Sequence, residues 1–295
     1  MGVISPNGPS VTATSPEPEA SGAPAYTGVR WVTEYEIDFA EYFAANGAKN
    51  FCVAASSHTE TLDGLDWTAY SDGSDLDVDT TTFEINANGL QITPVSGTGD
   101  TWGTACRAPR VGPFIANAVA ASGGPAYDYF ADTVCIQAYI TADDDPLTDD
   151  YRNFGILLDK QTSSSYDSWL RAVISHSTST TASVTRRTCN MAEPNLTSNP
   201  DFFEIIVGNN LANPRGRIGN WNGSFPEPGA PLHLSGSFVG VDASAVIKNQ
   251  EGAIDNVDIS DPTYANGRLS VTATAAGSAL PFTATIHKVR YLRLR

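Results

Sequence analysis

The sequence predicts an all-β protein, built as an antiparallel β-sandwich or jelly roll. Turn-forming residues are frequent, with 25 glycines and 18 prolines among 295 residues, whereas charged residues make up only 17% of the chain. Short runs of β-branched and aromatic residues recur about every ten residues with turn residues between them, which is typical of antiparallel sandwiches. No long segment repeats its apolar residues with the period of an amphipathic helix.

The first 28 residues differ from the rest of the chain and are predicted to be an extended arm. Pro, Ser, Ala, Gly and Thr dominate residues 1–28, and large apolar side chains are almost absent. Such a segment cannot bury enough apolar surface to offset the entropy lost on ordering. We therefore expect the arm to become ordered only against another chain, with a neighbouring subunit as its support. Residues 29–295 are expected to form one β-sandwich domain.

This domain is expected to open with the alternating strand WVTEYEIDF at residues 31–39. The segment TFEINANGLQIT at 82–93 predicts a hairpin, because an Asn-Gly pair between two alternating runs favours a tight turn, here at Asn88-Gly89. Residues 190–231 contain many Asn, Pro and Gly, which indicates long loops with few strands. Further strands are predicted at residues 132–141, 153–159, 168–175, 182–188, 202–208, 232–243, 267–275 and 282–294.

The charge of the chain argues against nucleic-acid and membrane partners. The formal net charge is −16, from 17 basic and 33 acidic residues, so phosphate backbones and anionic membrane surfaces would be repelled. No apolar run approaches the length that crosses a bilayer. The N-terminal sequence lacks the basic and apolar regions of a secretory signal, and synthesis in a cytoplasm is therefore expected.

The cysteines are expected to be reduced and mostly buried thiols. They are widely spaced and contain no Cys-x-x-Cys pair of the kind that zinc sites use: Cys52, Cys106, Cys135 and Cys189. Since nothing in the sequence indicates export, an oxidising compartment is not expected. No metal or other cofactor is predicted.

Several stretches of the sequence resemble the concanavalin A-like jelly rolls. They are the opening strand YEIDF, the strand GLQI, the pair FGILLD and SWLRAVI, and the closing strand ATIHKVRYLRL. The resemblance covers residues 29–295 as a strand pattern and implies a jelly roll of two sheets. This superfamily includes legume lectins, laminin G-like modules, phage virion proteins and laminarinase-type glycoside hydrolases, so the resemblance leaves binding, structural and catalytic functions open.

The stretch EYEIDFAE at residues 34–41 has two interpretations. Its Glu36, Asp38 and Glu41 match the E-x-D-x-x-E signature of the laminarinase-type hydrolases. That resemblance implies Glu36 as nucleophile, Asp38 as an orienting residue and Glu41 as acid/base. Because residues i and i+2 share one face of a strand, Glu41 would need a bulge to join the other two.

An ordinary half-buried strand explains the same stretch. The alternation places Tyr35, Ile37 and Phe39 toward the core and leaves the acidic residues from Glu34 to Asp38 in water. The motif directly follows the arm, whereas in the hydrolases it lies well inside the domain. A short motif outside its usual context often arises by chance. The strand interpretation is therefore preferred, no catalytic residue is assigned, and the protein is not expected to be an enzyme.

Two acidic stretches are interpreted as solvated loops. The loop DDDPLTDD holds Asp143, Asp144 and Asp145, whose oxygens are of the type that Ca²⁺ prefers. The EF-hand spacing and its terminal Glu are absent, so these aspartates are only weak metal candidates and no metal site is assigned. The acidic stretch 62–79 receives the same interpretation.

Aromatic and basic residues give two further candidates for binding. Trp102 and Trp221 lie in Gly-rich loops and are the candidates for contact with a sugar. The closing strand carries a notable share of the few cations, namely Lys288, Arg290, Arg293 and Arg295. These cations either pair with the acidic surface of a neighbouring copy, or they remain in water while the apolar residues between them pack.

These observations favour a non-enzymatic structural protein in the virion of a tailed bacteriophage: a capsid decoration protein, a head fibre or a tail-associated subunit. It would be made in the host cytoplasm and anchored through its arm to other virion subunits, copies of itself included. Its solvent-facing body offers a surface for host glycans. The alternatives are a carbohydrate-binding lectin module and the glycoside hydrolase that would use Glu36, Asp38 and Glu41.

Overall fold

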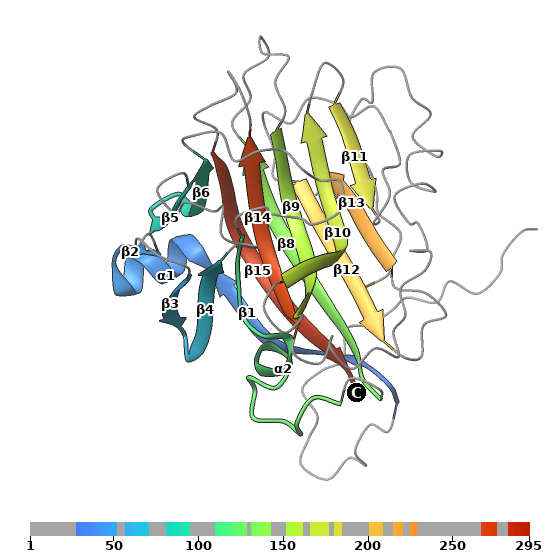
Figure 1. Ribbon diagram of the computed structural model, residues 1–295. Coiled ribbons are helices and arrows are strands. Elements are labelled where there is room, and N and C mark those ends of the chain that lie inside the picture. The colour runs from blue at the N-terminus through green and yellow to red at the C-terminus, as the bar shows by residue number, and fades with distance from the viewer. Residues whose placement is uncertain are drawn as a thin grey trace, which may run out of the picture. The chain divides into compact units, whose positions relative to one another are not determined.

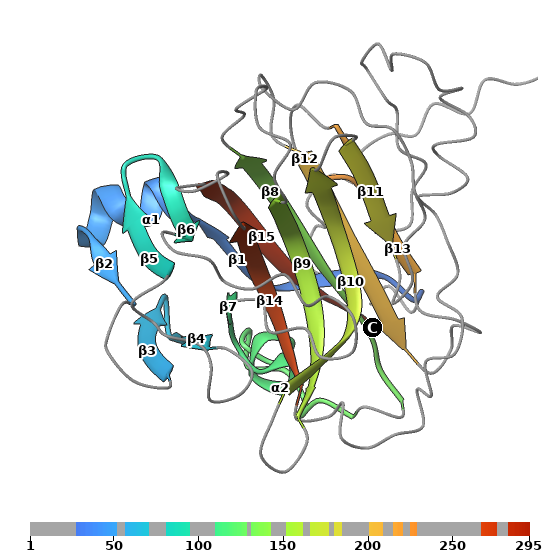
Figure 2. The same ribbon diagram turned by 45° about the horizontal axis from the view of Figure 1, so that its top comes forward.

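Two antiparallel sheets account for most of the chain that the computed structural model describes (Figures 1 and 2). Within the described residues, sheet A has eight strands, sheet B has seven, and the helices are short. The prediction of an all-β, sandwich-like fold is therefore confirmed. The described residues are 28–51, 57–70, 81–94, 110–128, 131–142, 152–161, 166–176, 180–184, 201–208, 215–220, 225–228, 267–275 and 283–295.

Sheet A runs in the order β13-β12-β8-β15-β6-β5-β2, and β1 pairs with β15 as well. Its strands are β1 (Trp31–Asp38), β2 (Lys49–Asn50), β5 (Thr81–Asn86), β6 (Gly89–Pro94), β8 (Thr133–Ala142), β12 (Asp201–Gly208), β13 (Arg215–Asn220) and β15 (Ala284–Leu294). Neighbouring strands that are far apart in sequence, such as β1 and β15, show that long-range pairing builds this sheet.

Sheet B runs in the order β11-β10-β9-β14-β7-β4-β3. Its strands are β3 (Ser57–Leu62), β4 (Leu65–Tyr70), β7 (Arg110–Gly112), β9 (Arg152–Gln161), β10 (Tyr166–His176), β11 (Thr180–Val184) and β14 (Arg268–Ala275), and the helices are α1 (Phe39–Asn46) and α2 (Ile115–Ala118). All these elements belong to one compact unit, Trp31–Arg295.

Strand β15 organises sheet A because it pairs with three other strands. One edge pairs with β8 from Ala284 to Arg293, and the other pairs first with β6 and then with β1. The change from β6 to β1 occurs near His287, where the register with β8 also shifts. In Figure 2, β15 runs beside β8, with β1 and β6 toward its other side. The register of this strand therefore fixes which side chains meet on both faces of the sheet.

The two sheets face each other across an aromatic core. Trp67 of β4 is fully buried, and its ring centroid lies 5.4 Å from that of Phe39 and 6.2 Å from that of Tyr291 on β15. A second contact joins Phe154 of β9 to Phe203 of β12 at 5.8 Å. Edge-to-face aromatic pairs of this kind contribute about 0.5–1.5 kcal/mol beyond the burial of their area. These contacts hold sheet A against sheet B.

Tyr35 fastens β1 to sheet B. Its hydroxyl donates a hydrogen bond to the Leu62 carbonyl at 3.0 Å and accepts one from Trp67 Nε1 at 3.3 Å. Burial raises the pKa of the Tyr35 hydroxyl well above its ordinary value, so the group stays protonated and remains a donor. Both buried polar groups gain a partner that they would otherwise lack.

Strand β1 ends where α1 begins, and this helix was not predicted. Asp38 is the N-cap: its Oδ1 accepts hydrogen bonds from the backbone N–H groups of Ala40 and Glu41, both at 3.1 Å. The helix ends before Gly47, whose φ of 79° suits a glycine and whose N–H donates to the Phe43 carbonyl at 2.8 Å. With only 8 residues, the helix is too short to show a periodic signal.

The hairpin β3–β4 corrects the interpretation of the acidic stretch 62–79 as a loop for residues 62–70, whereas residues 71–79 lie outside the described part of the chain. Asp63 and Gly64 form its two-residue turn with φ values of 47° and 82°, as expected of a type I′ turn. Leu65 and Trp67 then alternate with polar residues and face the core. The signal was present as Asp-Gly within an alternating run, but the number of aspartates obscured it.

Most of the other predicted strands are confirmed by β8, β9, β10, β12, β14 and β15. Strand β11 overlaps the beginning of the predicted strand 182–188, whose last residues lie outside the described part of the chain. The predicted strand 232–243 also lies outside it. Strand β13 is a correction, because it forms within the region 190–231 that was interpreted as long loops with few strands.

The predicted hairpin at 82–93 is confirmed, with its turn one residue earlier than expected. Strand β5 ends at Asn86 and β6 begins at Gly89, so Ala87 and Asn88 form the turn. Gly89 has a φ of 136°, and a β-carbon at this position would lie 2.6 Å from the carbonyl oxygen of Ile286 on β15. Only glycine allows β15 to approach the hairpin so closely.

We expect Gly89→Ala to lower the free energy of unfolding by about 2–4 kcal/mol, because it combines backbone strain with a clash against another strand. The matched control is Gly64→Ala, since Gly64 also has a positive φ but a β-carbon added there would meet no atom within 4 Å. This control should cost only about 1 kcal/mol. Urea unfolding of both variants measures the difference, and equal losses would contradict the close approach.

Candidate functional site

The acidic motif is divided between a strand and a helix. Glu36 and Asp38 lie on β1, whereas Glu41 lies in the first turn of α1 and is exposed. The hydrolase interpretation required a bulged strand that continues through Glu41. That strand does not form, because Asp38 caps a helix at this point. Asp38 therefore has a structural role, because it ends β1 and caps the N-terminus of α1.

Lys288 of β15 lies against both β1 carboxylates. Its Nζ is 3.3 Å from Oδ2 of Asp38 and 3.7 Å from Oε1 of Glu36. The pairing of β1 with β15 produces this contact, because Asp38 and Lys288 are register partners. All three side chains are partly exposed, so each ion pair contributes only about 0–1 kcal/mol. In this structure, Asp38 of the acidic motif is the N-cap of α1, and Asp38 and Glu36 each form a surface ion pair with Lys288.

Part of the outer face of sheet A, which points away from sheet B, is buried. On β8, Ile136 and Ala138 belong to the core between the sheets, so Gln137 and Tyr139 point to the opposite face. Both are nonetheless buried. An outer face in a sandwich is usually solvated, so the residues buried here require a separate explanation.

Four polar side chains from four neighbouring strands align on this outer face. Register partners place Glu204 of β12 opposite Gln137, Gln137 opposite Arg290 of β15, and Arg290 opposite Glu36. Gln137 Nε2 donates to Glu204 Oε2 at 2.6 Å, while Arg290 Nε and Nη2 donate to Gln137 Oε1 at 3.0 and 2.7 Å. We call Glu204, Gln137, Arg290 and Glu36 the polar row.

Phe225 and Pro226 lie over the polar row. The carbonyl oxygen of Pro226 accepts hydrogen bonds from Gln137 Nε2 and from Arg290 Nη2, both at 3.0 Å. The Phe225 ring stacks on Tyr139 with centroids 4.6 Å apart and planes 22° apart, and the Arg290 guanidinium lies 4.9 Å from the same ring. We call Gln137, Tyr139 and Arg290 the Pro226 seat.

Tyr139 has a buried hydroxyl with no hydrogen-bond partner among the described residues. The residue is 6% exposed, and its ring also contacts Phe202 at 5.8 Å. Burial raises the pKa of this hydroxyl well above its ordinary value; nearby Arg290 acts in the opposite direction and Glu36 in the same direction. The hydroxyl is therefore a protonated donor that lacks an acceptor within the described part of the chain. Such groups are rare in native proteins.

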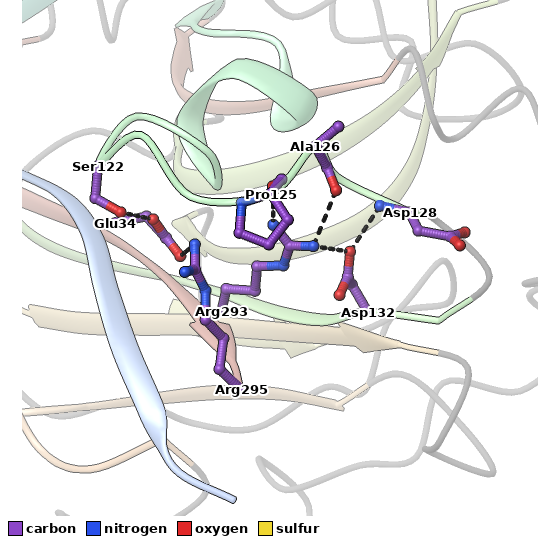
Figure 3. A network of polar contacts seen from close by, with 8 residues as sticks. All are labelled: Glu34, Ser122, Pro125, Ala126, Asp128, Asp132, Arg293 and Arg295. Carbon is purple, nitrogen blue, oxygen red and sulfur yellow. Dashed lines mark hydrogen bonds and ion pairs between the residues drawn. The ribbon is translucent and has the colours of Figure 1, made fainter. Parts of the chain in front are cut away.

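A second polar cluster lies at the end of β15 (Figure 3). Arg293 Nη1 donates to the Pro125 carbonyl at 2.5 Å, and Nη2 donates to the Ala126 carbonyl at 3.0 Å and to Asp132 Oδ2 at 2.5 Å. The Arg293 and Asp132 side chains are only 5% and 15% exposed. The guanidinium thus holds the loop between α2 and β8 against the end of sheet A.

Glu34 joins this cluster through a bulge in β1. The register with β15 shifts between Thr33 and Tyr35, which leaves Glu34 as an extra residue. Its carboxylate is buried and contacts Arg295 and the Ser122 hydroxyl. The expectation that Glu34 faces water is therefore wrong, whereas Tyr35 is buried as predicted. The alternation alone could not reveal the bulge. We call Glu34, Ser122, Asp132, Arg293 and Arg295 the C-terminal cluster.

The expectation that the four closing cations remain in water is wrong for Arg293, which is buried. Lys288, Arg293 and Arg295 form ion pairs with carboxylates of the same chain, and Arg290 belongs to the polar row. Arg293 is thus buried rather than solvated, and the pairing of these cations with a neighbouring copy stays a prediction. The apolar residues between them are buried as predicted in the cases of Val289, Tyr291 and Leu292.

His287 lies at the irregularity where β15 changes partners. Its Nε2 is 2.7 Å from the Thr141 hydroxyl on β8. Burial lowers the pKa of the His287 imidazole below its ordinary value of 6.5, although the nearby Asp38 carboxylate acts in the opposite direction. The folded protein therefore favours a neutral ring at this position.

The remaining predicted site residues lie outside the described residues: Trp102, Trp221, Asp143, Asp144 and Asp145. Within the described ranges, no group of three or more His, Cys, Asp or Glu side chains is placed to hold a metal ion. No helix in that same part of the chain is long and apolar enough to cross a membrane. Cys135 is a buried thiol, as predicted; the other three cysteines are not among the described residues.

The geometry thus defines an all-β protein of two antiparallel sheets, with a partly covered polar row on the outer face of one sheet. No family model matches the sequence, and no curated protein matches it either. The polar row could not have been found from the sequence, because Gln137 and Arg290 are 153 positions apart and nothing in either segment marks the other as its partner.

Arg293→Met should lower the free energy of unfolding by about 3–5 kcal/mol, because it leaves the Asp132 carboxylate and two carbonyls without their shared donor. Lys49→Met is the matched control. It breaks an ion pair to Glu60 at 3.2 Å whose side chains are 33% and 24% exposed, so it should cost at most about 1 kcal/mol. Urea unfolding of both variants tests the contrast; similar losses would contradict a special role for the C-terminal cluster.

The pH dependence of stability should contain a contribution from His287. Unfolded chains protonate this ring as the pH falls through 6.5, whereas the folded chain resists protonation because its pKa is lower. The free energy of unfolding should therefore decrease as the pH falls below about 6.5 and stop decreasing below the folded pKa. In His287→Gln this part of the slope should vanish, which urea unfolding at about pH 7.5 and about pH 5 would show. Identical slopes in both proteins would refute it.

Proposed function

We propose that this chain is a non-enzymatic structural subunit of a tailed bacteriophage virion, with a concanavalin A-like jelly-roll body and an anchoring arm at residues 1–28. It would serve as a capsid decoration protein, head fibre or tail-associated subunit. The observation that carries the non-enzymatic part is the use of the acidic motif in building the fold. Asp38 caps α1, Lys288 pairs with Asp38 and Glu36, and Glu41 lies on the helix rather than on the strand.

The charges of the body support an anchor located elsewhere. The chain carries a formal net charge of −16, and the closing cations are engaged by its own carboxylates and polar row. Like-charged copies repel one another unless specific contacts outweigh the repulsion. Attachment through the arm does not depend on the charge of the body, so it would hold copies in place despite their repulsion.

The composition of the arm supports this anchoring role. Residues 1–28 hold few large apolar side chains and cannot stabilise a fold of their own. A segment of this kind gains order when it binds extended on a partner, through main-chain hydrogen bonds and small pockets. Many copies in one particle would add avidity to a weak single contact. The virion is thus the expected location, after synthesis in the host cytoplasm.

Deletion of residues 2–28 should abolish incorporation into the particle while the body remains folded. The expected result is an unchanged urea midpoint for the truncated chain and the absence of this chain from purified particles. As a control, a chain in which residues 2–28 are replaced by a Gly/Ser sequence of equal length should fail in the same way. Normal incorporation of the truncated chain would contradict the arm as anchor. Turnover of a β-glucan or agar that is lost in Glu36→Gln would contradict the non-enzymatic part.

A further inference from the structure

The Pro226 seat binds a peptide carbonyl with two donors from different strands. Gln137 is oriented by its neighbours in the polar row, because Glu204 accepts from its amide nitrogen and Arg290 donates to its amide oxygen. The amide N–H group and the Arg290 guanidinium then converge on one oxygen, that of Pro226. The donors of the seat are thus fixed by the sheet rather than by the segment that they bind.

Burial of the charged groups in the polar row is unfavourable, because they lose their hydration. A buried charge is desolvated at a cost of several kcal/mol, and apolar residues of similar volume are often as stable or more stable. Networks of this kind contribute specificity, since a group that cannot accept both hydrogen bonds leaves buried donors unsatisfied. The seat therefore selects for a carbonyl acceptor, and its aromatic half selects for a flat or compact group beside that carbonyl.

Two further observations point to a second ligand for the seat. The buried Tyr139 hydroxyl is a donor with no acceptor among the described residues. In addition, the tripeptide Pro-Glu-Pro occurs at two places in the sequence, at 226–228 beside the seat and at 16–18 within the arm. A proline has no backbone N–H to satisfy, so its segment can present carbonyl acceptors to such a seat without burying an unmatched donor.

We propose that the Pro226 seat is a peptide-docking site, and that its occupant in the assembly is the Pro16-Glu17-Pro18 segment from the arm of a neighbouring copy, in exchange with residues 226–228. The inference rests on the proposed function and names the surface that receives the arm. The 13 peptide steps from Pro18 to Trp31 span at most about 45 Å when extended, which is comparable to the diameter of a domain of this size and allows contact with an adjacent copy. Exchange is required because the seat holds one carbonyl at a time.

Binding of a labelled peptide of residues 12–21 to the full chain tests the seat directly by fluorescence anisotropy. The matched control is the same peptide with Pro16→Ala and Pro18→Ala. Phe225→Ala weakens the segment already in the seat, so it should tighten binding of the native peptide about tenfold and leave the control peptide unchanged. A partly unfolded variant would not show this selective gain.

Arg290→Gln should weaken binding about tenfold. The absence of peptide binding to both the wild type and Phe225→Ala would overturn the proposal.

A second experiment separates this inference from the proposed function. Full chains with Pro16→Ala and Pro18→Ala should be incorporated into particles at least about tenfold less than the wild type, if one seat contact is repeated over many copies. Normal incorporation of this variant, together with loss of incorporation on deletion of residues 2–28, would refute the seat as the docking site while leaving the arm as anchor. Normal incorporation of the deleted chain would instead refute the anchor itself.

Discussion

The pairing of β15 with β1, β6 and β8 is the constraint on which the described structure depends. Its residues alternate between the core, where Val289 and Tyr291 are buried, and the outer face, where Lys288 and Arg290 meet the acidic motif and the polar row. A slip of one residue would exchange these two sets. It would place the charges in the core and remove the salt bridge of Arg293, so several separate features enforce the same register.

Polar groups on sheet A specify the fold more than they stabilise it. The Asp38 cap fixes the end of β1. The bulge at Glu34 places this side chain beside Arg295, and the polar row positions Phe225 and Pro226. Each contributes little net free energy after desolvation. Their shared effect is to exclude alternative arrangements of strands that have similar hydrophobic patterns, which is a recurrent difficulty for sandwiches made of many short strands.

The sequence revealed the parts of the fold that local pattern determines. Alternation and turn residues located β8, β15 and the β5–β6 hairpin, because each signal lies within a dozen residues. The β3–β4 hairpin was not predicted, because its aspartates were interpreted as part of a charged loop. The Asp63-Gly64 turn nevertheless lies between alternating apolar residues. The role of Asp38 was ambiguous because one carboxylate fits both a catalytic motif and a helix cap. The polar row and the C-terminal cluster depend on register between distant strands, which no local pattern encodes.

The late position of β15 in the sequence has a consequence for how the protein is made. Translation adds about 5–20 residues per second. The edge of β1 therefore stays unpaired until β15, which ends at Leu294, has left the ribosome. Sheet A can therefore not be completed before β15 emerges, and nascent chains expose the edges of β1 and β8 for some time. A slow step of long-range strand closure is the physical outcome of the large separation in sequence between β1 and β15.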